Sequence, residues 1–162
     1  MRRRASLLLP VAVAGAAAWG CGSAADGEFT GRVERVVDGD TIIVQGPGGR
    51  ERVRYIGIDT PESVAPDRPV ECYGPEASEA NHRLVDGQEV RLVPGTESRD
   101  RYGRLLAYVY LPGSERSVNA ELVRRGAADT LTIAPNTEHA GELAALREGA
   151  RDRGAGLWGR CR

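Results

Sequence analysis

The chain has 162 residues, of which 41% are hydrophobic and 28% charged. These proportions are typical of a globular protein and exclude a largely disordered one, and the length suits one domain rather than two. All 22 basic residues are arginine, and the formal net charge is -1. A protein with this balance that binds a polyanion has to concentrate its positive potential locally.

Residues 1–20 have the three parts of an export signal: three arginines, an apolar run and mostly small residues. We expect them to be a signal peptide, and residues 21–27 to be a flexible linker. Pro10 and Gly15 interrupt the apolar run, which is too short for a membrane span. Three of the 22 arginines lie in residues 1–20, so 19 remain against 23 acidic residues, a net charge of -4.

Cys21 follows Ala18-Trp19-Gly20, which resembles the cleavage box of a bacterial lipoprotein. We therefore expect lipidation of Cys21 and an exported, cell-surface lipoprotein that contacts the membrane through its lipid anchor alone. The alternative is ordinary cleavage after Ala24 or Ala25 and free secretion.

Cys72 and Cys161 remain as a pair if Cys21 carries lipid. Disulfides persist in the oxidising compartments that exported proteins reach, so we predict a bond between these two cysteines. It would close a loop of about 90 residues, which the chain-entropy account values at roughly 4–5 kcal/mol. Two free thiols are the alternative.

The β pattern begins at residue 29. Two β-rich runs, residues 29–37 and 40–44, flank an Asp-Gly step, which is typical of a hairpin. Residues 45–50 are expected to form the next turn. Residues 53–62, VRYIGIDTPE, read as a third strand followed by a bend, because a proline keeps the residue before it out of the helical region.

Arg54 lies on this third strand, and Asp59, Thr60 and Glu62 lie at its bend. Regular alternation would put Arg54 and Asp59 on opposite faces of one strand. They can share a site only if the chain leaves strand geometry near Gly57. A cation, two carboxylates and a hydroxyl gathered in this way could hold a metal and a phosphate together.

The rest of the chain continues with further strands and helices. Apolar spacing and start signals predict helices over residues 74–85, 118–125 and 136–151. Two more strands are predicted over residues 88–93 and 102–111, with loops over 63–70 and 94–100. Five short strands with helices between and after them indicate an α+β fold built on a small closed barrel. Trp158 is expected to pack against the body and pin the tail.

Three clusters hold the candidate site residues: residues 38–41 (DGDT), Arg54 with residues 59–62 (DTPE), and residues 100–104 (DRYGR). Singly, each is explained by a turn, a helix cap or a solvated strand start. Their order and spacing together indicate a catalytic site. Their oxygen donors suit a hard divalent cation, and neither His82 nor His139 falls among them, which argues against zinc.

The sequence resembles the staphylococcal nuclease (thermonuclease) family over roughly residues 29–158, a range that includes these three clusters. The segments that carry the resemblance are VVDGDTIIV, VRYIGIDTPE, CYGPEAS, RDRYGRLLAYVY and NAELVRRG. The resemblance implies a five-stranded OB-fold β-barrel with about three helices, occupying residues 28–160. It also implies calcium-dependent hydrolysis of phosphodiester bonds in DNA and RNA. No protein partner is implied, and we expect a monomer.

The resemblance also implies roles for residues at the matching motif positions. Asp40 and Asp59 would bind Ca²⁺ directly, and the carbonyl of Thr60 would complete the protein ligands. Glu62 would orient or deprotonate the attacking water.

The remaining roles concern the substrate. Arg54 and Arg104 would hold the scissile phosphate, and Tyr102 would lie against the nucleotide. The chain departs from the family pattern after Gly126, because residues 127–133 contain no aromatic side chain. Base stacking of roughly 1–3 kcal/mol per base would then be missing. The acidic mature chain also disfavours tight, salt-tolerant binding of DNA.

A catalytically silent OB-fold module that binds nucleic acid at the cell surface is the alternative function. Such a protein would be expected to lack one of the residues that carry the chemistry. All of these are present: Asp40, Arg54, Asp59, Glu62 and Arg104.

Overall fold

The computed structural model describes residues 27–63 and 69–161. The strands are β1 (Phe29–Val36), β2 (Thr41–Gly46), β3 (Gly49–Tyr55), β4 (Gly57–Asp59), β5 (Glu89–Arg99), β6 (Leu105–Tyr110) and β7 (Asp129–Leu131). The helices are α1 (Gly74–Val85), α2 (Val118–Arg124), α3 (Ala140–Asp152) and α4 (Leu157–Arg160).

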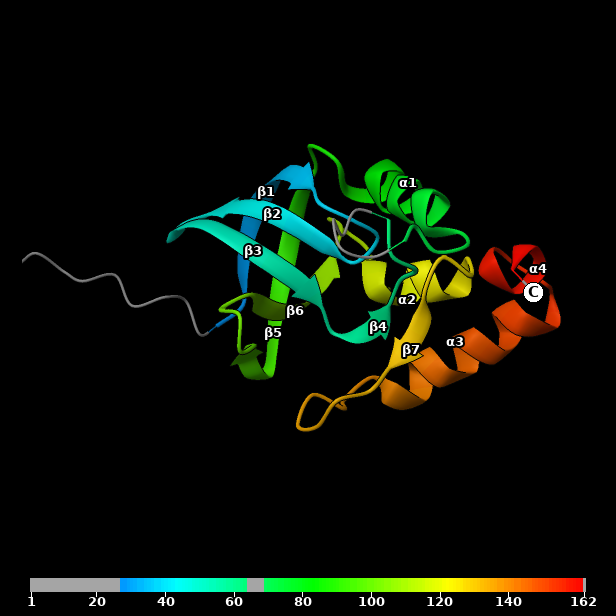
Figure 1. Ribbon diagram of the computed structural model, residues 1–162. Coiled ribbons are helices and arrows are strands. Elements are labelled where there is room, and N and C mark those ends of the chain that lie inside the picture. The colour runs from blue at the N-terminus through cyan, green and yellow to red at the C-terminus, as the bar shows by residue number, and fades with distance from the viewer. Residues whose placement is uncertain (1–26, 64–68, 162) are drawn as a thin grey trace, which may run out of the picture.

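Five strands close into a barrel in the order β1-β2-β3-β6-β5 (Figure 1). All neighbours pair antiparallel except β3 and β6, which pair parallel with Val53 opposite Leu105. The predicted five-stranded barrel of an α+β fold is therefore confirmed. The parallel pairing places β3, which carries Arg54, beside the strand that follows Arg104.

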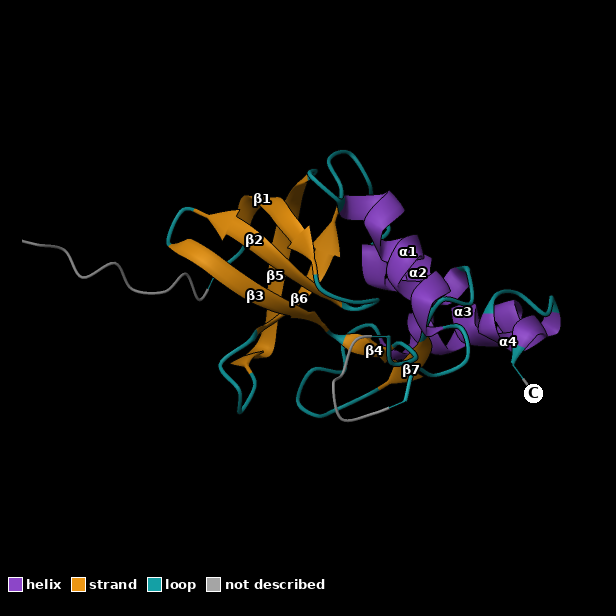
Figure 2. Ribbon diagram, turned by 45° about the horizontal axis from the view of Figure 1, so that its top comes forward, coloured by secondary structure: helices purple, strands orange, loops and turns teal. Residues whose placement is uncertain are grey.

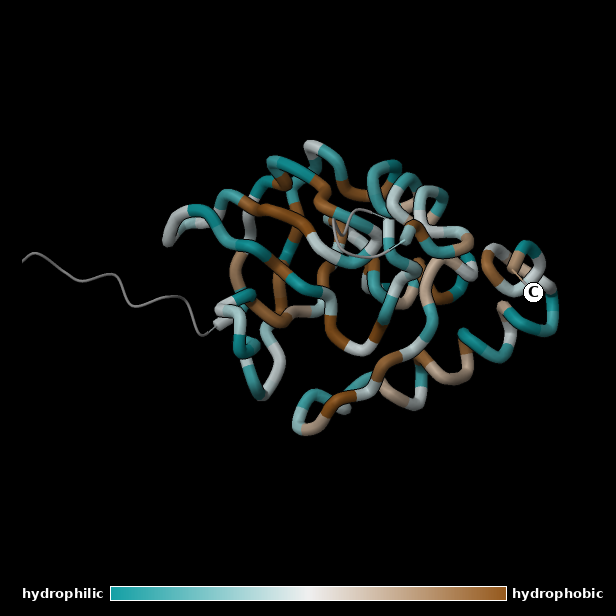
Figure 3. The backbone as a smooth tube through the Cα atoms, viewed as in Figure 1, coloured by the Kyte–Doolittle hydropathy of each residue, from teal (hydrophilic) through white to brown (hydrophobic). Residues whose placement is uncertain are grey.

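Apolar side chains from alternate strand positions fill the barrel, because successive residues of a strand face opposite sides. The largest of them are fully buried: Ile42, Val44, Val53, Tyr55, Leu92 and Leu105. Figure 3 shows the apolar stretches, in brown, running along the barrel strands. The Tyr55 hydroxyl donates a hydrogen bond to Oδ1 of Asn81 at 3.0 Å, which joins the barrel to α1.

The helices lie together at one side of the barrel (Figure 2). Asn119, at the start of α2, is fully buried. Its Oδ1 accepts a hydrogen bond from the Val109 N–H at 3.0 Å, and its Nδ2 donates to the Ile56 carbonyl at 2.8 Å. One amide therefore ties α2 to β6 and to the junction between β3 and β4.

Several boundaries differ from the expectation; β3, for example, begins at Gly49, inside the predicted turn over residues 45–50. Two of the differences have a visible cause. The predicted loop over residues 94–100 is wrong, since β5 continues to Arg99. Its pairing with β6 shifts register between Pro94 and Arg99, and such an irregularity lets a strand carry a proline. The helix expected from residue 136 begins at Ala140 instead. The Asn136 side chain holds the backbone of Glu97 through two hydrogen bonds of 2.9 Å.

Three short elements were not predicted. Strands β4 and β7 form a separate two-stranded sheet in which Asp59 faces Asp129. Helix α4 contains Trp158, which is partly buried, as expected of a residue that pins the tail. The guanidinium of Arg151 lies 5.2 Å from the centre of the indole ring.

Cys72 and Cys161 form the predicted disulfide, with their Cα atoms 5.8 Å apart. The expectations for residues 1–20 and for Cys21 lie outside the described residues. In the part of the chain that is described, no helix is both long and apolar enough to cross a membrane.

Candidate active site

The chain leaves regular strand geometry between β3 and β4, as the sequence required. β3 ends at Tyr55, and Gly57 has a φ of 79°, a backbone conformation that residues other than glycine rarely adopt. The break lets the Arg54 side chain turn along its own backbone. Its Nη1 donates to the carbonyls of Tyr55 at 3.0 Å and Ile58 at 2.9 Å.

Arg54 joins two carboxylates of different exposure. Its Nη1 lies 3.1 Å from Oδ2 of Asp40, and its Nη2 lies 2.9 Å from Oδ1 of Asp59. The Asp40 side chain is 6% exposed and that of Asp59 is 60% exposed. The contact with Asp59 is thus open to competition from solvent or a ligand, whereas the contact with Asp40 is sheltered.

Asp40 accepts hydrogen bonds on both carboxylate oxygens. The Thr41 hydroxyl donates to Oδ1 at 3.1 Å, and Thr60 donates to Oδ2 from its N–H at 3.0 Å and its hydroxyl at 3.1 Å. These three donors fix the orientation of the Asp40 carboxylate. Thr60 also binds the bend after β4 to the turn before β2.

Asp38 is an acidic neighbour to which the sequence assigned no role. Its Oδ1 accepts from the Asp40 N–H at 3.0 Å, and its carbonyl accepts from Nδ2 of Asn81 at 2.9 Å. Burial, followed by the charge of Asp40, raises the pKa of Asp38 to about 6. The Asp-Gly-Asp pattern was the available signal, but the burial that shifts the pKa is a tertiary property.

Arg104 is held by the turn before β6. Its Nε donates to Oδ2 of Asp100 at 2.7 Å, and Oδ1 of Asp100 accepts the N–H groups of Tyr102 and Arg104, each at 2.9 Å. Burial raises the pKa of Asp100, but the hydrogen bonds from Arg104 and the backbone outweigh it, so the pKa lies below its usual value. Asp100 therefore orients Arg104 as an ionised partner.

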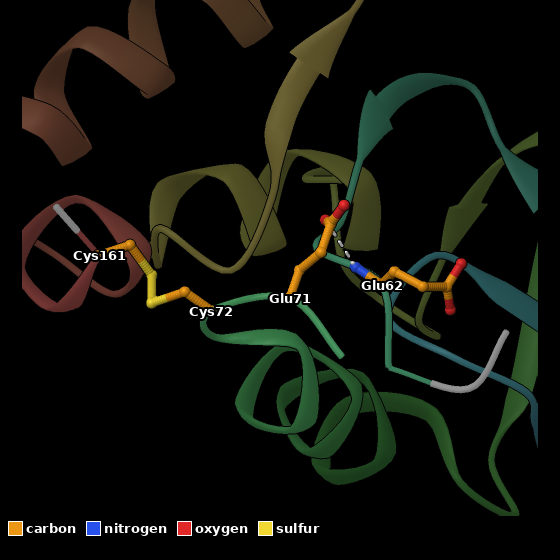
Figure 4. The surroundings of a disulfide bond; sticks show 4 residues. All are labelled: Glu62, Glu71, Cys72 and Cys161. Carbon is orange, nitrogen blue, oxygen red and sulfur yellow. Dashed lines mark hydrogen bonds between the residues drawn. A yellow bond between two sulfur atoms is a disulfide. The ribbon is translucent and has the colours of Figure 1, made fainter. Parts of the chain in front are cut away.

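Glu62 is fixed through its main chain. Its N–H donates to Oε2 of Glu71 at 3.0 Å, and its carbonyl accepts the Glu71 N–H at 2.9 Å. Its own Oε1 accepts the Ser63 N–H at 2.9 Å. Figure 4 shows the Glu62 carboxylate pointing away from Glu71 and the disulfide.

The six predicted metal, phosphate and water-handling residues meet around one polar cavity of about 140 Å³. The residues that line it are Asp38, Asp40, Thr41, Arg54, Asp59, Thr60, Pro61, Glu62 and Arg104. Residues from three separate stretches of the chain are thus brought together.

A second cavity, of about 470 Å³, shares Arg54 and Arg104 with the first. Tyr102, which is 68% exposed, lines it together with Leu131 and Ile133. The stretch after Gly126 therefore reaches the site with aliphatic side chains. The lack of aromatic residues over 127–133 is visible in the sequence, whereas this apolar lining of the cavity is not.

The donors around the smaller cavity fit a hard divalent cation. In the described ranges, no three His, Cys, Asp or Glu side chains converge as a metal-binding group. Asp40 and Asp59 supply carboxylates, and Thr60 lies beside them with a backbone carbonyl to offer. An all-oxygen set of carboxylates and a carbonyl is what calcium prefers.

A closed five-stranded barrel of this strand order, with helices at one side, is an OB-fold. Residues 52–160 match the family described as "Staphylococcal nuclease homologue". The chain belongs to the staphylococcal nuclease family.

Individual relatives agree with this assignment. The thermonuclease of Staphylococcus hyicus is 40% identical over 131 residues, covering 81% of this chain and 76% of the relative. The thermonuclease of Staphylococcus intermedius is 40% identical over 128 residues, covering 79% and 75%. Endonuclease YncB of Bacillus subtilis (strain 168) is 37% identical over 128 residues, covering 78% and 60%.

Proposed function

We propose that this protein is a calcium-dependent nuclease that cleaves DNA and RNA. As a member of its family it is a hydrolase of phosphodiester bonds. The observation that carries the proposal is the convergence of Asp40, Arg54, Asp59, Glu62 and Arg104 on one small polar cavity.

The two arginines account for recognition of the phosphate. They reach the cavity from β3 and from the turn before β6, and their side chains are 14% and 26% exposed. Guanidinium groups donate directed, paired hydrogen bonds to phosphate oxygens. Attack on the phosphorus builds negative charge on those oxygens, and a donor already in place stabilises that charge most in the transition state.

Glu62 handles the water. As the water oxygen forms its bond to phosphorus, one water proton passes to the Glu62 carboxylate. The bond from phosphorus to the leaving nucleoside oxygen breaks, and that oxygen takes a proton from solvent. The backbone contacts with Glu71 support this role, because they fix where the Glu62 side chain begins.

Asp40, Asp59 and the Thr60 carbonyl are the groups that would hold calcium. The bound ion would add positive charge beside the phosphate. In the protein itself, Arg54 links the two aspartates, and Thr60 fixes Asp40. These contacts preserve the spacing of the oxygen donors.

The nucleoside next to the scissile phosphate is proposed to occupy the larger cavity. Tyr102 offers an exposed ring there, beside Arg104. Leu131 and Ile133 offer apolar contact in place of aromatic stacking. Such contacts do not distinguish bases by hydrogen bonding, so we expect cleavage with little base preference.

Digestion of a plasmid and of a structured RNA with purified protein tests this function. We expect fragments of both in millimolar calcium and none after a calcium chelator is added, with activity restored by excess calcium. Undiminished cleavage in the chelator would refute the calcium requirement, and intact substrates in calcium would refute the nuclease.

We also propose export and lipidation at Cys21. The Cys72–Cys161 bond supports export, because disulfides persist in oxidising compartments. Replacement of Cys21 by serine should move the protein from the membrane fraction to the medium. Unchanged fractionation would favour ordinary secretion.

A further inference from the structure

Glu71 holds the backbone of Glu62 at two points. The Glu71 carboxylate accepts the Glu62 N–H at 3.0 Å, and the Glu71 N–H donates to the Glu62 carbonyl at 2.9 Å. We call this pair of hydrogen bonds the Glu62–Glu71 clamp. Both bonds act on the main chain of Glu62, and neither uses its carboxylate. Glu62 lines the polar cavity.

The disulfide continues directly from the clamp. Cys72, the next residue after Glu71, is bonded to Cys161 (Figure 4). The Cys161 N–H donates to the Leu157 carbonyl at 2.8 Å, and the Leu157 N–H donates to the Gly126 carbonyl at 2.9 Å. A covalent bond and two hydrogen bonds thus connect the clamp to the end of α2.

The start of α1 closes against the same residue. A Cβ atom at Gly74 would collide with the carbonyl oxygen of Glu62, so a glycine is needed there. The Gly74 N–H also donates to the Glu71 carbonyl at 3.0 Å. The main chain of Glu62 is therefore bounded on one side by residues 71–74.

We propose that Glu71 is a positioning residue for Glu62, and that the Cys72–Cys161 disulfide anchors it. The inference rests on the proposed role of Glu62 in handling water. The bond to the Glu71 side chain lies at the surface, where water competes for the same N–H. An anchored neighbour limits that competition, because Glu71 cannot drift away from Glu62. A base that is displaced by a fraction of an ångström loses its alignment with the water.

Steady-state cleavage at saturating calcium tests the role of Glu71. Glu71→Ala removes the acceptor, and we expect kcat to fall about 10-fold with KM little changed, as for a misplaced catalytic group. Glu71→Gln keeps an oxygen acceptor and should stay within about 3-fold of the wild-type kcat. The matched control is Glu79→Ala, an exposed glutamate on α1 that pairs with Arg83. Equal kcat in wild type and Glu71→Ala would overturn the proposal.

A second measurement separates positioning from a general structural role. In a Glu62→Gln background, Glu71→Ala should lower kcat only slightly further, because the effects of substitutions at residues that act as one unit are not additive. If Glu71→Ala costs the same in both backgrounds, it does not act through Glu62 and the proposal fails. An inactive wild type would instead refute the proposed function, and a fully active Glu62→Gln would refute the proposed role of Glu62.

The anchoring role of the disulfide has its own test. Wild type reduced with a phosphine, with loss of the bond verified by thiol counting, should lose kcat about as much as Glu71→Ala. The Cys72→Ser/Cys161→Ser double variant provides the same comparison without reductant, and circular dichroism checks that it is folded. Reduction of the disulfide in the Glu71→Ala variant should lower kcat little further. Full activity in verified, folded, reduced protein would overturn the anchoring role.

Discussion

Arg54 contributes to the site through its geometry as well as its charge. Its Nη1 and Nη2 contact two carboxylates and two carbonyls, all within 3.1 Å. A lysine ammonium is a point donor and cannot span that set. Arg104 is held in a comparable way by Asp100.

Arg54→Lys and Arg104→Lys are therefore expected to lose activity although they keep the charge. If the guanidiniums meet charge that develops in the transition state, kcat should fall more than KM rises. Steady-state kinetics on a short DNA substrate measure both. Arg83→Lys is the control, because its side chain is 69% exposed and contacts Glu79 away from the site. If Arg54→Lys and Arg104→Lys both kept the wild-type kcat, the proposed role of the two guanidinium groups would be wrong.

Glu62→Gln keeps the size of the side chain and removes the base. We expect turnover to fall on the order of 10²–10⁴-fold, as for loss of a general base, with calcium binding largely kept. Calorimetric titration of calcium alongside kinetics checks the two expectations separately. A turnover near wild type in the folded variant would exclude Glu62 as the base.

Asp40→Asn tests the metal site with the least change of shape. The variant lacks one negative charge among the oxygen donors, so we expect activity to require at least about 10-fold more calcium. Activity measured against calcium concentration gives this shift. Asp86→Asn on the exposed end of α1 serves as the control. An unchanged calcium requirement would contradict the role of Asp40 as a ligand.

Among the elements, α2 has both a cap and a charge cluster. The Ser117 hydroxyl accepts the Ala120 N–H at 3.1 Å. Hydrogen bonds from Arg124 and then Arg125, together with their charges, lower the pKa of Glu121 from 4.5 to about 2. A lowered pKa stabilises the fold above pH 4.5, and that contribution is lost as the pH falls from 4.5 towards 2.

Glu121→Gln should therefore be less stable than wild type at pH 7, by roughly 1–2 kcal/mol once solvent screening is allowed for. The difference should shrink as the pH falls below 4.5, because wild type loses the same contribution. Urea unfolding at pH 7, 5 and 3.5 measures it. A difference that stays constant over this range would show that the carboxylate charge is not its source.

Local signals predicted some elements and missed others for physical reasons. The bounds of α1 match the prediction of residues 74–85, because Pro75 and Gly87 mark its ends in the sequence. The break at Gly57 was required by the positions of Arg54 and Asp59. Strand β7 and the late start of α3 depend on pairing with β4 and on Asn136 holding Glu97. Such distant partners leave no local pattern.

The candidate site divides in the same way. Its charged residues lie in short, dense clusters, so Asp40, Arg54 and Glu62 could be named from the sequence. The raised pKa of Asp38 arises from burial. The apolar lining that Leu131 and Ile133 give the larger cavity arises from where β7 and the residues after it lie in the fold. Both need the assembled molecule.

For the whole molecule, the Cys72–Cys161 bond links residues 89 apart in the sequence. Its loss should lower the free energy of unfolding by about 2–5 kcal/mol, as for other native disulfides. Urea unfolding of wild type and of the Cys72→Ser/Cys161→Ser variant measures this difference. Equal midpoints and slopes would show that the bond adds nothing to stability.

The same bond also determines what happens when the chain is cut. Arg116 stands in an exposed turn between β6 and α2, a natural target for a protease. A cut there falls between Cys72 and Cys161, so the two pieces stay covalently joined. Arg54 and Glu62 would remain on one piece, and Arg104 with them, while α2 and α3 would be retained by the disulfide. A nuclease built in this way can be nicked by a protease and still not come apart.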